Sequence, residues 1–182
     1  MTSTSLSNTS DELALDQTGL AAARTSLDDG AITPAYGPHR DAIVKLLNDA
    51  LATELVCILR YKRHHFMATG LSSPAIAEEF MVHASEETEH SDMLAKRIVQ
   101  LGGEPDFSPS TLLARSHADY DDSNDLKTMV RVNLIAERVA IEAYHQMIQL
   151  IGDKDTTTRR VLEHILSQEE EHADELHDWL ED

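Results

Sequence analysis

The sequence predicts an all-α protein: an antiparallel four-helix bundle with one long crossover between the second and third helices. Three observations predict it. The 182 residues contain seven Gly, five Pro and only eight aromatic residues, and the rest is rich in aliphatic residues, Ala and Glu, which favour helix over sheet. Four long segments each carry an apolar stripe at alternating steps of four and three. The connections between them are short, long and short, as in a bundle of two antiparallel hairpins.

Glycine and proline mark the boundaries of the first two helices. The first runs from about His39 to Thr69 and ends at Gly70. Ser72-Ser73-Pro74 offers a cap and a first-turn proline for the second, which ends before Gly102-Gly103. The connection between these helices is too short for anything but an antiparallel hairpin.

The second hairpin follows a crossover of about 20 residues, in which we expect a short helix near Leu112–His117. The third long helix runs from about Ser123 to Ile151 and ends at Gly152. Either Asp153 or Asp155 caps the fourth, which continues to the end of the sequence. The bundle is therefore expected to cover residues 39–182.

Residues 1–38 are rich in Ser, Thr, Asp and Gly and contain one basic residue, Arg24. We interpret this stretch as a flexible polar and acidic tail, with a short helix near Ser10–Leu15. A solvated tail without a separate role is the first interpretation, and a tail that packs on a neighbouring subunit is the second.

The charge balance excludes several partners. Fifteen Lys and Arg stand against 33 Asp and Glu, so the formal charge is −18, which repels DNA and anionic membranes and attracts cations. No apolar run is long enough to cross a bilayer, and the first residues do not resemble a signal peptide. The single cysteine, Cys57, cannot build a disulfide framework and is expected to be an inert buried thiol, so we expect a cytoplasmic protein.

Each apolar stripe carries one glutamate close to the middle of its helix: Glu54, Glu87, Glu137 and Glu169. All four should therefore meet at one level in the core. A single buried carboxylate costs several kcal/mol or takes up a proton. Because the stripes supply no Lys or Arg at that level, a metal ion is the natural source of compensating charge.

Two histidines sharpen this prediction. His90 follows Glu87 by three positions and His172 follows Glu169 by three, which places each carboxylate and imidazole on one helix face. Two single glutamates with two Glu-x-x-His pairs are the ligand set of carboxylate-bridged dinuclear bundles. We expect Glu87 and Glu169 to bridge two metal ions, with Glu54 and Glu137 as terminal ligands. Oxygen-rich ligation with one nitrogen each suits iron, with manganese also possible.

A weak internal repeat accompanies these ligands. Glu87 follows Glu54 by 33 positions and Glu169 follows Glu137 by 32, and a tyrosine lies seven positions after each single glutamate. We expect Tyr61 to hydrogen-bond a ligand carboxylate or to donate an electron, and Tyr144 to be an ordinary core residue.

These residues, together with the segment ELVCILRYKRHHFMATG, resemble the bacterioferritin and Dps-like miniferritin branch of the ferritin-like superfamily over about residues 39–182. The resemblance implies a ferritin-like fold and oxidation of two Fe(II) by O2 or H2O2. It makes Glu54, Glu87, His90, Glu137, Glu169 and His172 the metal ligands, with Tyr61 beside them. Storage or detoxification of iron in a protein shell follows as the expected function.

Two departures from bacterioferritins matter. The position after the bridging Glu87 is Thr88, where those proteins carry their haem-ligating Met, so we predict no haem there. Only ten residues follow His172, so the short fifth helix of the 24-subunit shell is not expected. A homo-oligomer of twelve chains is favoured over one of 24 or a dimer.

The remaining histidines are weaker candidates. His64 could reach the inner edge of the site, and His83 could support a ligand from behind. His117, His145, His164 and His177 are expected on the surface.

The main alternative function is a di-iron or di-manganese peroxidase or catalase that stores no mineral. A rubrerythrin-type electron relay lacks the required cysteines. A DNA-protecting miniferritin would need a basic tail, and direct DNA binding is therefore not expected. A membrane-attached quinol oxidase relative would need an apolar anchoring patch.

Overall fold

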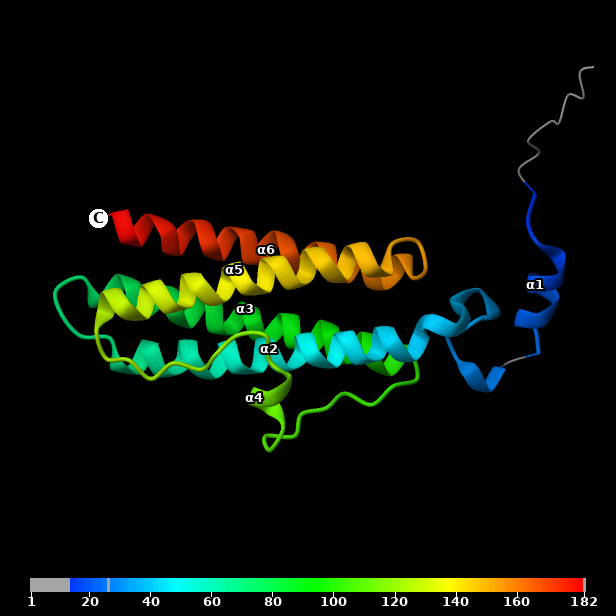
Figure 1. Cartoon of the computed structure of the whole chain (residues 1–182), viewed down its shortest axis with the longest axis horizontal. Helices are drawn as coiled ribbons and strands as arrows, with labels where there is room; N and C mark the ends of the chain where they lie inside the picture. Colours follow the sequence, from blue (N-terminus) through cyan, green and yellow to red (C-terminus); the bar gives the residue numbers. More distant parts are fainter. Residues whose placement is uncertain (1–13, 26, 182) are drawn as a thin grey trace, which may run out of the picture.

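A computed structural model describes residues 14–25 and 27–181 of the chain. Within these ranges all regular structure is helical, and the four long helices form two antiparallel hairpins (Figure 1). The first hairpin is α2 (Arg40–Met67) with α3 (Ser73–Gln100), and the second is α5 (Leu126–Ile151) with α6 (Thr156–Glu181). The predicted all-α, ferritin-like bundle with one long crossover is confirmed.

Side-chain caps explain where the second hairpin begins and turns. The Asp125 carboxylate accepts from the Thr128 amide at 2.8 Å, so α5 begins at Leu126, three residues later than predicted. At the turn, Gly152 adopts a positive φ of 51° and ends α5. The Asp155 carboxylate then accepts from the Thr158 amide at 2.9 Å, so Asp155 rather than Asp153 caps α6.

The crossover lies along α2 and contains the short helix α4 (Leu112–Arg115), which packs against α2 (Figure 1). Polar side chains hold it there. Arg115 donates to the backbone carbonyl of Asn48 at 2.7 Å, and the Asn48 side chain accepts from the Asp106 amide at 2.7 Å. Arg63 of α2 donates to the Ser123 carbonyl at 2.9 Å. Two of these bonds satisfy the Asp106 amide and the Ser123 carbonyl, which lie outside regular structure.

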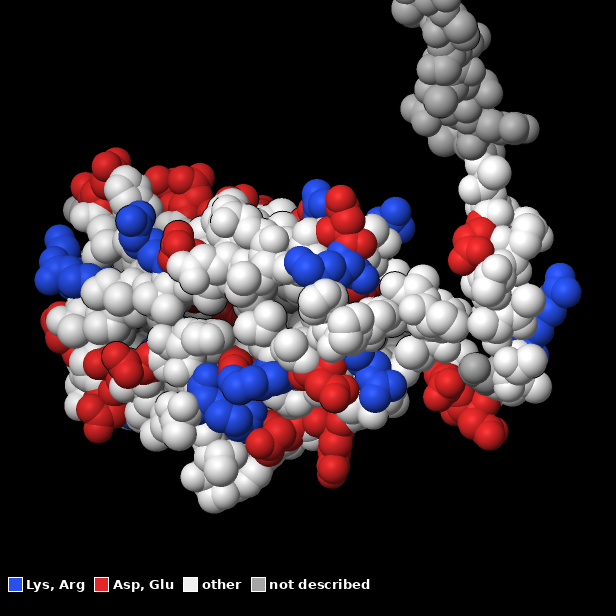
Figure 2. All heavy atoms as spheres, turned by 45° about the vertical axis from the view of Figure 1, so that its right-hand side comes forward, with Lys and Arg blue, Asp and Glu red and all other residues white. Residues whose placement is uncertain are grey.

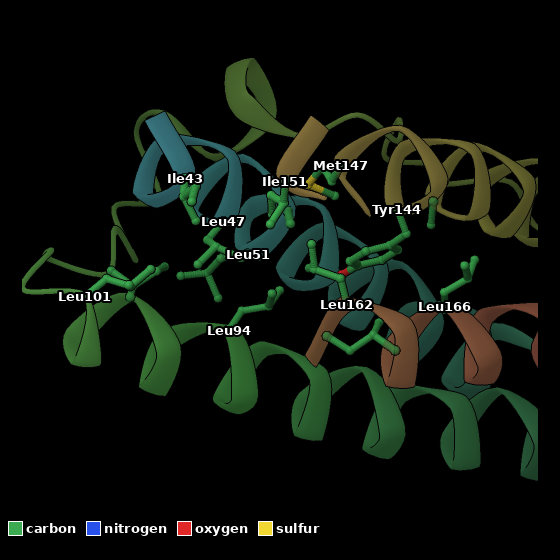
Figure 3. Packing of buried hydrophobic residues seen from close by; sticks show 14 residues of the cluster. Ile43, Leu47, Leu51, Leu94, Leu101, Tyr144, Met147, Ile151, Leu162 and Leu166 are labelled. Carbon is green, nitrogen blue, oxygen red and sulfur yellow. The ribbon is translucent and has the colours of Figure 1, made fainter. Parts of the chain in front are cut away.

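Two apolar clusters fill the bundle, one on each side of its middle. The first, shown in part in Figure 3, draws on all four long helices and includes Leu47, Leu51, Leu94, Ile98, Leu101, Tyr144, Met147, Ile151, Leu162 and Leu166. The second contains Tyr61, Ile76, Phe80, Met129, Val130 and Leu176. The buried acids lie between them.

The residues before α2 form α1 (Gln17–Ala23) and two short 3-10 helices, η1 (Leu27–Asp29) and η2 (Pro34–His39). Asp16 caps α1, which lies apart from the bundle in Figure 1. The helix predicted near Ser10–Leu15 falls mostly on residues 1–13, which lie outside the described part, and Leu15 itself is not helical. A domain boundary near residue 38 stays a prediction. None of the helices in the described residues has the length and apolar character needed to span a membrane.

A buried ion pair joins the end of α3 to the start of α6. The Arg97 guanidinium donates to both carboxylate oxygens of Asp155 at 2.9 Å and to the Thr158 hydroxyl at 2.8 Å. Both partners of the ion pair are almost fully buried. Removing one partner would leave the other charge uncompensated.

We therefore expect Arg97→Ala to destabilise the metal-free protein by about 3–5 kcal/mol. The exposed Arg160→Ala is the matched control and should stay within about 0.5 kcal/mol of wild type. Urea unfolding followed by circular dichroism measures both. Equal midpoints for Arg97→Ala and wild type would show that this ion pair does not stabilise the bundle.

Candidate metal centre

Six buried polar side chains converge in the middle of the bundle. Each long helix contributes one glutamate, and α3 and α6 add one histidine each: Glu54, Glu87, His90, Glu137, Glu169 and His172, all at most 2% exposed. We call this set the six-residue centre. The four acids thus meet in the core, as their positions near the middle of each helix predict.

Two overlapping groups make up the six-residue centre. Glu54, Glu87, His90 and Glu169 offer ligand atoms within 4.8 Å of one another, and so do Glu87, Glu137, Glu169 and His172. Glu87 and Glu169 belong to both groups. The arrangement can therefore accept two cations that share two carboxylates, with one imidazole and one further carboxylate for each cation.

Neighbouring side chains orient the His90 ring. Its Nε2 lies 3.1 Å from the amide oxygen of Gln168, which can only accept, so Nε2 carries the hydrogen. Its Nδ1 then points at the acids, 3.1 Å from a Glu169 oxygen and 3.2 Å from a Glu87 oxygen. A partner that holds the outer nitrogen fixes both the tautomer and the ring orientation for a metal ligand.

His172 repeats this arrangement in the second group. Its Nε2 lies 2.9 Å from a Glu86 oxygen, and its Nδ1 lies 3.6 Å from Glu169 and 3.9 Å from Glu87. Sequence reasoning missed Glu86 and Gln168 as partners. The available signal was position, because each directly precedes one of the shared glutamates.

Two tyrosines hold the unshared glutamates across the bundle. The Tyr61 hydroxyl on α2 donates to Oε1 of Glu137 on α5, and the Tyr144 hydroxyl on α5 donates to Oε1 of Glu54 on α2. Tyr144 lies in the buried core, as predicted, but the hydrogen bond from its hydroxyl to a ligand glutamate was not predicted. The internal repeat was the signal, since it places both tyrosines seven positions after a glutamate.

Several polar atoms of the centre have no hydrogen-bond partner among the described residues: Glu87 Oε1, Glu137 Oε2, both Glu169 oxygens and His172 Nδ1. Buried polar atoms without partners are rare in proteins. All of these atoms face one another across the six-residue centre, and all are good ligands for a cation. The residues present therefore fit a pair of metal ions.

Burial sets the protonation of the metal-free centre. Burial raises the pKa of the Glu87 and Glu137 carboxyls well above the usual range, and the neighbouring Glu169 charge raises both further. Burial alone would lower the pKa of His172, but Glu169 and Glu137 raise it to about 9. Protons thus supply the positive charge when metal is absent.

One buried cation near the centre was not predicted. Arg60 is fully buried and donates to the Asn133 side chain at 2.7 Å, the Asp119 carbonyl at 3.0 Å and the Cys57 sulfur at 3.4 Å. Its donors are directed at these groups and not at the four acids, so it does not replace a metal. Burial raises the pKa of Cys57, which keeps the thiol protonated.

His64 does not reach the six-residue centre. Its Nδ1 lies 3.0 Å from the Asn133 side-chain nitrogen, and its Nε2 lies 3.3 Å from an Asp121 oxygen. Burial lowers its pKa to about 4. The four histidines expected on the surface are exposed: His117, His145, His164 and His177.

His83 lies directly behind the centre. Its ring stacks on the His172 ring with centroids 4.1 Å apart, and its Nδ1 lies 3.1 Å from the Tyr61 oxygen. Burial, followed by the charge of His172, lowers the pKa of His83 to about 3, so the ring is neutral at neutral pH.

A comparison with known protein families shows which family has this architecture. The family model described as the ferritin-like domain matches residues 44–182. The chain belongs to the ferritin-like family. Its relatives include proteins named bacterioferritin and proteins named for DNA protection during starvation.

One relative from each of these two named groups is described below. A bacterioferritin of Desulfovibrio desulfuricans is 27% identical over 131 residues, covering 71% of this chain and 69% of its own. The DNA protection during starvation protein of Halobacterium salinarum is 31% identical over 143 residues, covering 76% of this chain and 78% of its own.

Solved structures agree with this grouping. A bacterioferritin-related protein from Bacteroides fragilis, described as a dodecameric thioferritin, is 30% identical with a TM-score of 0.74, covering 78% of this chain and 85% of that one. An archaeal Dps homologue from Halobacterium salinarum is 28% identical with a TM-score of 0.75, covering 79% and 82%.

Because Tyr144 and Tyr61 orient carboxylates of the centre, we expect Tyr144→Phe and Tyr61→Phe each to weaken metal binding about 10- to 100-fold. Phe keeps the ring packing, so helix content should not change. Competition with a coloured chelator measures affinity for Co(II). Wild-type affinity in both variants would show that these hydroxyls do not position the ligands.

The raised pKa values also predict a pH dependence. The pKa values of metal-free Glu87, Glu137 and His172 are all raised, so a cation that binds these groups competes with protons. Metal binding should therefore release protons, and the affinity should rise between pH 6 and pH 9. Titration of Co(II) into weakly buffered protein, with pH recorded, counts the protons; no proton release would contradict the protonated metal-free centre.

Proposed function

We propose that this chain oxidises Fe(II) at a dinuclear centre within its own four-helix bundle and retains the ferric product, so that it stores or detoxifies iron. One observation carries the proposal: two four-residue ligand groups share Glu87 and Glu169, and their unpartnered oxygens face a common space. A structural role alone does not account for this concentration of buried acid.

The ligand chemistry favours iron. Each group offers three carboxylates and one imidazole, a set that suits Fe(II), and manganese is a further candidate for the same donors. Two Fe(II) ions supply two electrons, one each, when they are oxidised to Fe(III). H2O2 would take up both electrons and two protons to give two water molecules, and O2 would take up both electrons and two protons to give H2O2. Glu87, Glu137 and His172 have raised pKa values and can supply protons within the site.

The hydrogen bonds around the centre serve this chemistry. Tyr61 occupies one oxygen of Glu137 and leaves Oε2 free to ligate. Gln168 and Glu86 hold the outer nitrogens of His90 and His172, so that both Nδ1 atoms face inward. The ligands are thus oriented before metal enters, which limits the reorganisation that binding and oxidation require.

Family membership supports iron as the substrate. The relatives include bacterioferritins at 27% identity, and the Bacteroides fragilis structure at 30% identity is described as a thioferritin. These likenesses support iron storage or ferroxidase chemistry at a coarse level. The six-residue centre makes the proposal specific to positions in this chain.

We further propose that twelve chains assemble into one particle. We also propose that no haem binds at the position of Thr88. The dodecameric Bacteroides fragilis protein supports the first part. Thr88 supports the second, because its hydroxyl donates to the Ala84 carbonyl at 2.8 Å and offers no thioether. Light scattering should give about 240 kDa for twelve chains of 20.2 kDa.

Direct DNA binding is not part of the proposal, although some relatives are named for DNA protection. The formal charge is −18, and the face drawn in Figure 2 carries acidic and basic side chains around broad neutral areas, without a continuous basic surface. Phosphate binding needs clustered Lys and Arg.

The decisive variant is Glu87→Ala, which removes a ligand shared by both groups. We expect Fe(II) oxidation to fall to the protein-free rate, because neither ion keeps its ligand set. Glu89→Ala on the exposed face of α3 is the matched control and should oxidise Fe(II) at the wild-type rate. Absorbance of ferric product and O2 or H2O2 consumption measure both.

If Glu87→Ala oxidised Fe(II) at the wild-type rate, the assignment of the six-residue centre would be wrong. Iron counted in the protein peak after aerobic loading separates storage from turnover. Tens of iron atoms retained per chain support storage. Retention that stops at about two per chain, with continued peroxide turnover, would instead identify a di-metal peroxidase.

A further inference from the structure

A second group of metal-binding residues lies outside the six-residue centre. Glu79 and His83 on α3 and Glu175 on α6 offer ligand atoms within 4.8 Å of one another. We call these three residues the outer cluster. His83 Nε2 lies 2.9 Å from a Glu175 oxygen and 3.6 Å from a Glu79 oxygen. Ligand atoms around an ion at about 2.1 Å are themselves separated by about 3.0–3.4 Å, so little movement is needed.

Hydrogen-bond counting fixes the orientation of the His83 ring. The single Tyr61 hydroxyl hydrogen goes to Glu137, so the Tyr61 oxygen accepts from His83 Nδ1. The other ring nitrogen, Nε2, faces Glu79 and Glu175. Nε2 and the two carboxylates are all possible metal ligands, and their atoms converge on one space. A cation between them would bind to all three.

The internal repeat shows that packing does not require these residues. The shared glutamates, Glu87 and Glu169, relate the two hairpins position by position. On that register Glu79 corresponds to Val161, His83 to Ile165 and Glu175 to Met93. Ile165 is fully buried and Val161 and Met93 pack against the apolar core. The same places in the other half of the bundle are thus filled by apolar side chains, and the ligand atoms occur on one side alone.

The outer cluster lies between solvent and the six-residue centre. The Glu175 and Glu79 side chains are 44% and 27% exposed, whereas His83 is fully buried. The His83 ring stacks on His172 of the centre. An ion held by the two glutamates and Nε2 is therefore in contact with water on one side and is one imidazole away from the centre on the other.

We propose that Glu79, His83 and Glu175 form a third divalent-cation site, which takes Fe(II) or a similar ion such as Mn(II), Co(II) or Zn(II). The site itself does not depend on the proposed function. A role for this site in binding Fe(II) next to His172, before the ion reaches the six-residue centre, does rest on the proposed function. Two carboxylates and one imidazole leave positions for water, so the ion is bound more weakly and exchanges faster than ions with four protein ligands.

The test counts Co(II) bound to the full-length protein after equilibrium dialysis at about 0.3 M salt, which screens scattered surface carboxylates. Wild type should bind about three Co(II) per chain and Glu79→Gln/Glu175→Gln about two. The matched control, Glu78→Gln/Glu171→Gln, makes the same charge change at exposed positions on the same helices and should keep about three. Anomalous X-ray scattering at the cobalt edge then locates each ion.

Glu87→Ala separates this inference from the proposed centre, because it should lose the two inner ions and keep the outer one. About two Co(II) on wild type, both lost in Glu87→Ala, would overturn the outer site and leave the centre standing. Three ions retained by Glu79→Gln/Glu175→Gln would also overturn it. A single ion that Glu87→Ala keeps and the outer variant loses would support the outer site and overturn the centre.

Discussion

The burial of four carboxylates at one level of an apolar bundle is the constraint on which the rest of this structure depends. Each charge alone would cost several kcal/mol in such surroundings. The bundle meets this cost by surrounding the acids with donors. Two imidazoles lie among them, two tyrosine hydroxyls bind the unshared glutamates, and protons or metal ions supply the remaining charge. The apolar clusters on either side of the acids keep water out and preserve the geometry.

Most of the fold could be predicted from the helical periodicity of the sequence. The stripes through Glu54, Glu87, Glu137 and Glu169 follow from a repeat of about 3.6 residues, and the positions of Gly70, Gly102 and Gly152 mark turns. On α5 the buried face includes Asn133, Ala136 and Ala140, whereas the larger Leu134 and Ile141 are only partly buried. Small residues there allow close contact with neighbouring helices, which a count of apolar positions does not reveal.

The hydrogen-bond partners were harder to find in the sequence, for a physical reason. Gln168, Glu86 and Tyr144 act across the bundle, and such contacts depend on the rotation of one helix against another. Arg60 was missed for the same cause, since its partners Asn133 and Asp119 lie on other segments. The internal repeat relates Tyr61 to Tyr144 and Glu86 to Gln168, but it gives no signal for Arg60.

The partners cross between the hairpins in every case. Tyr61 and Glu86 on the first hairpin hold Glu137 and His172 on the second, while Tyr144 and Gln168 on the second hold Glu54 and His90 on the first. For these four ligands, the side chain that holds the carboxylate or the outer ring nitrogen always comes from the other hairpin. During synthesis the first hairpin leaves the ribosome before the second exists. A nascent chain therefore offers no ordered site to a redox-active ion, and the chemistry begins only once the whole bundle encloses it.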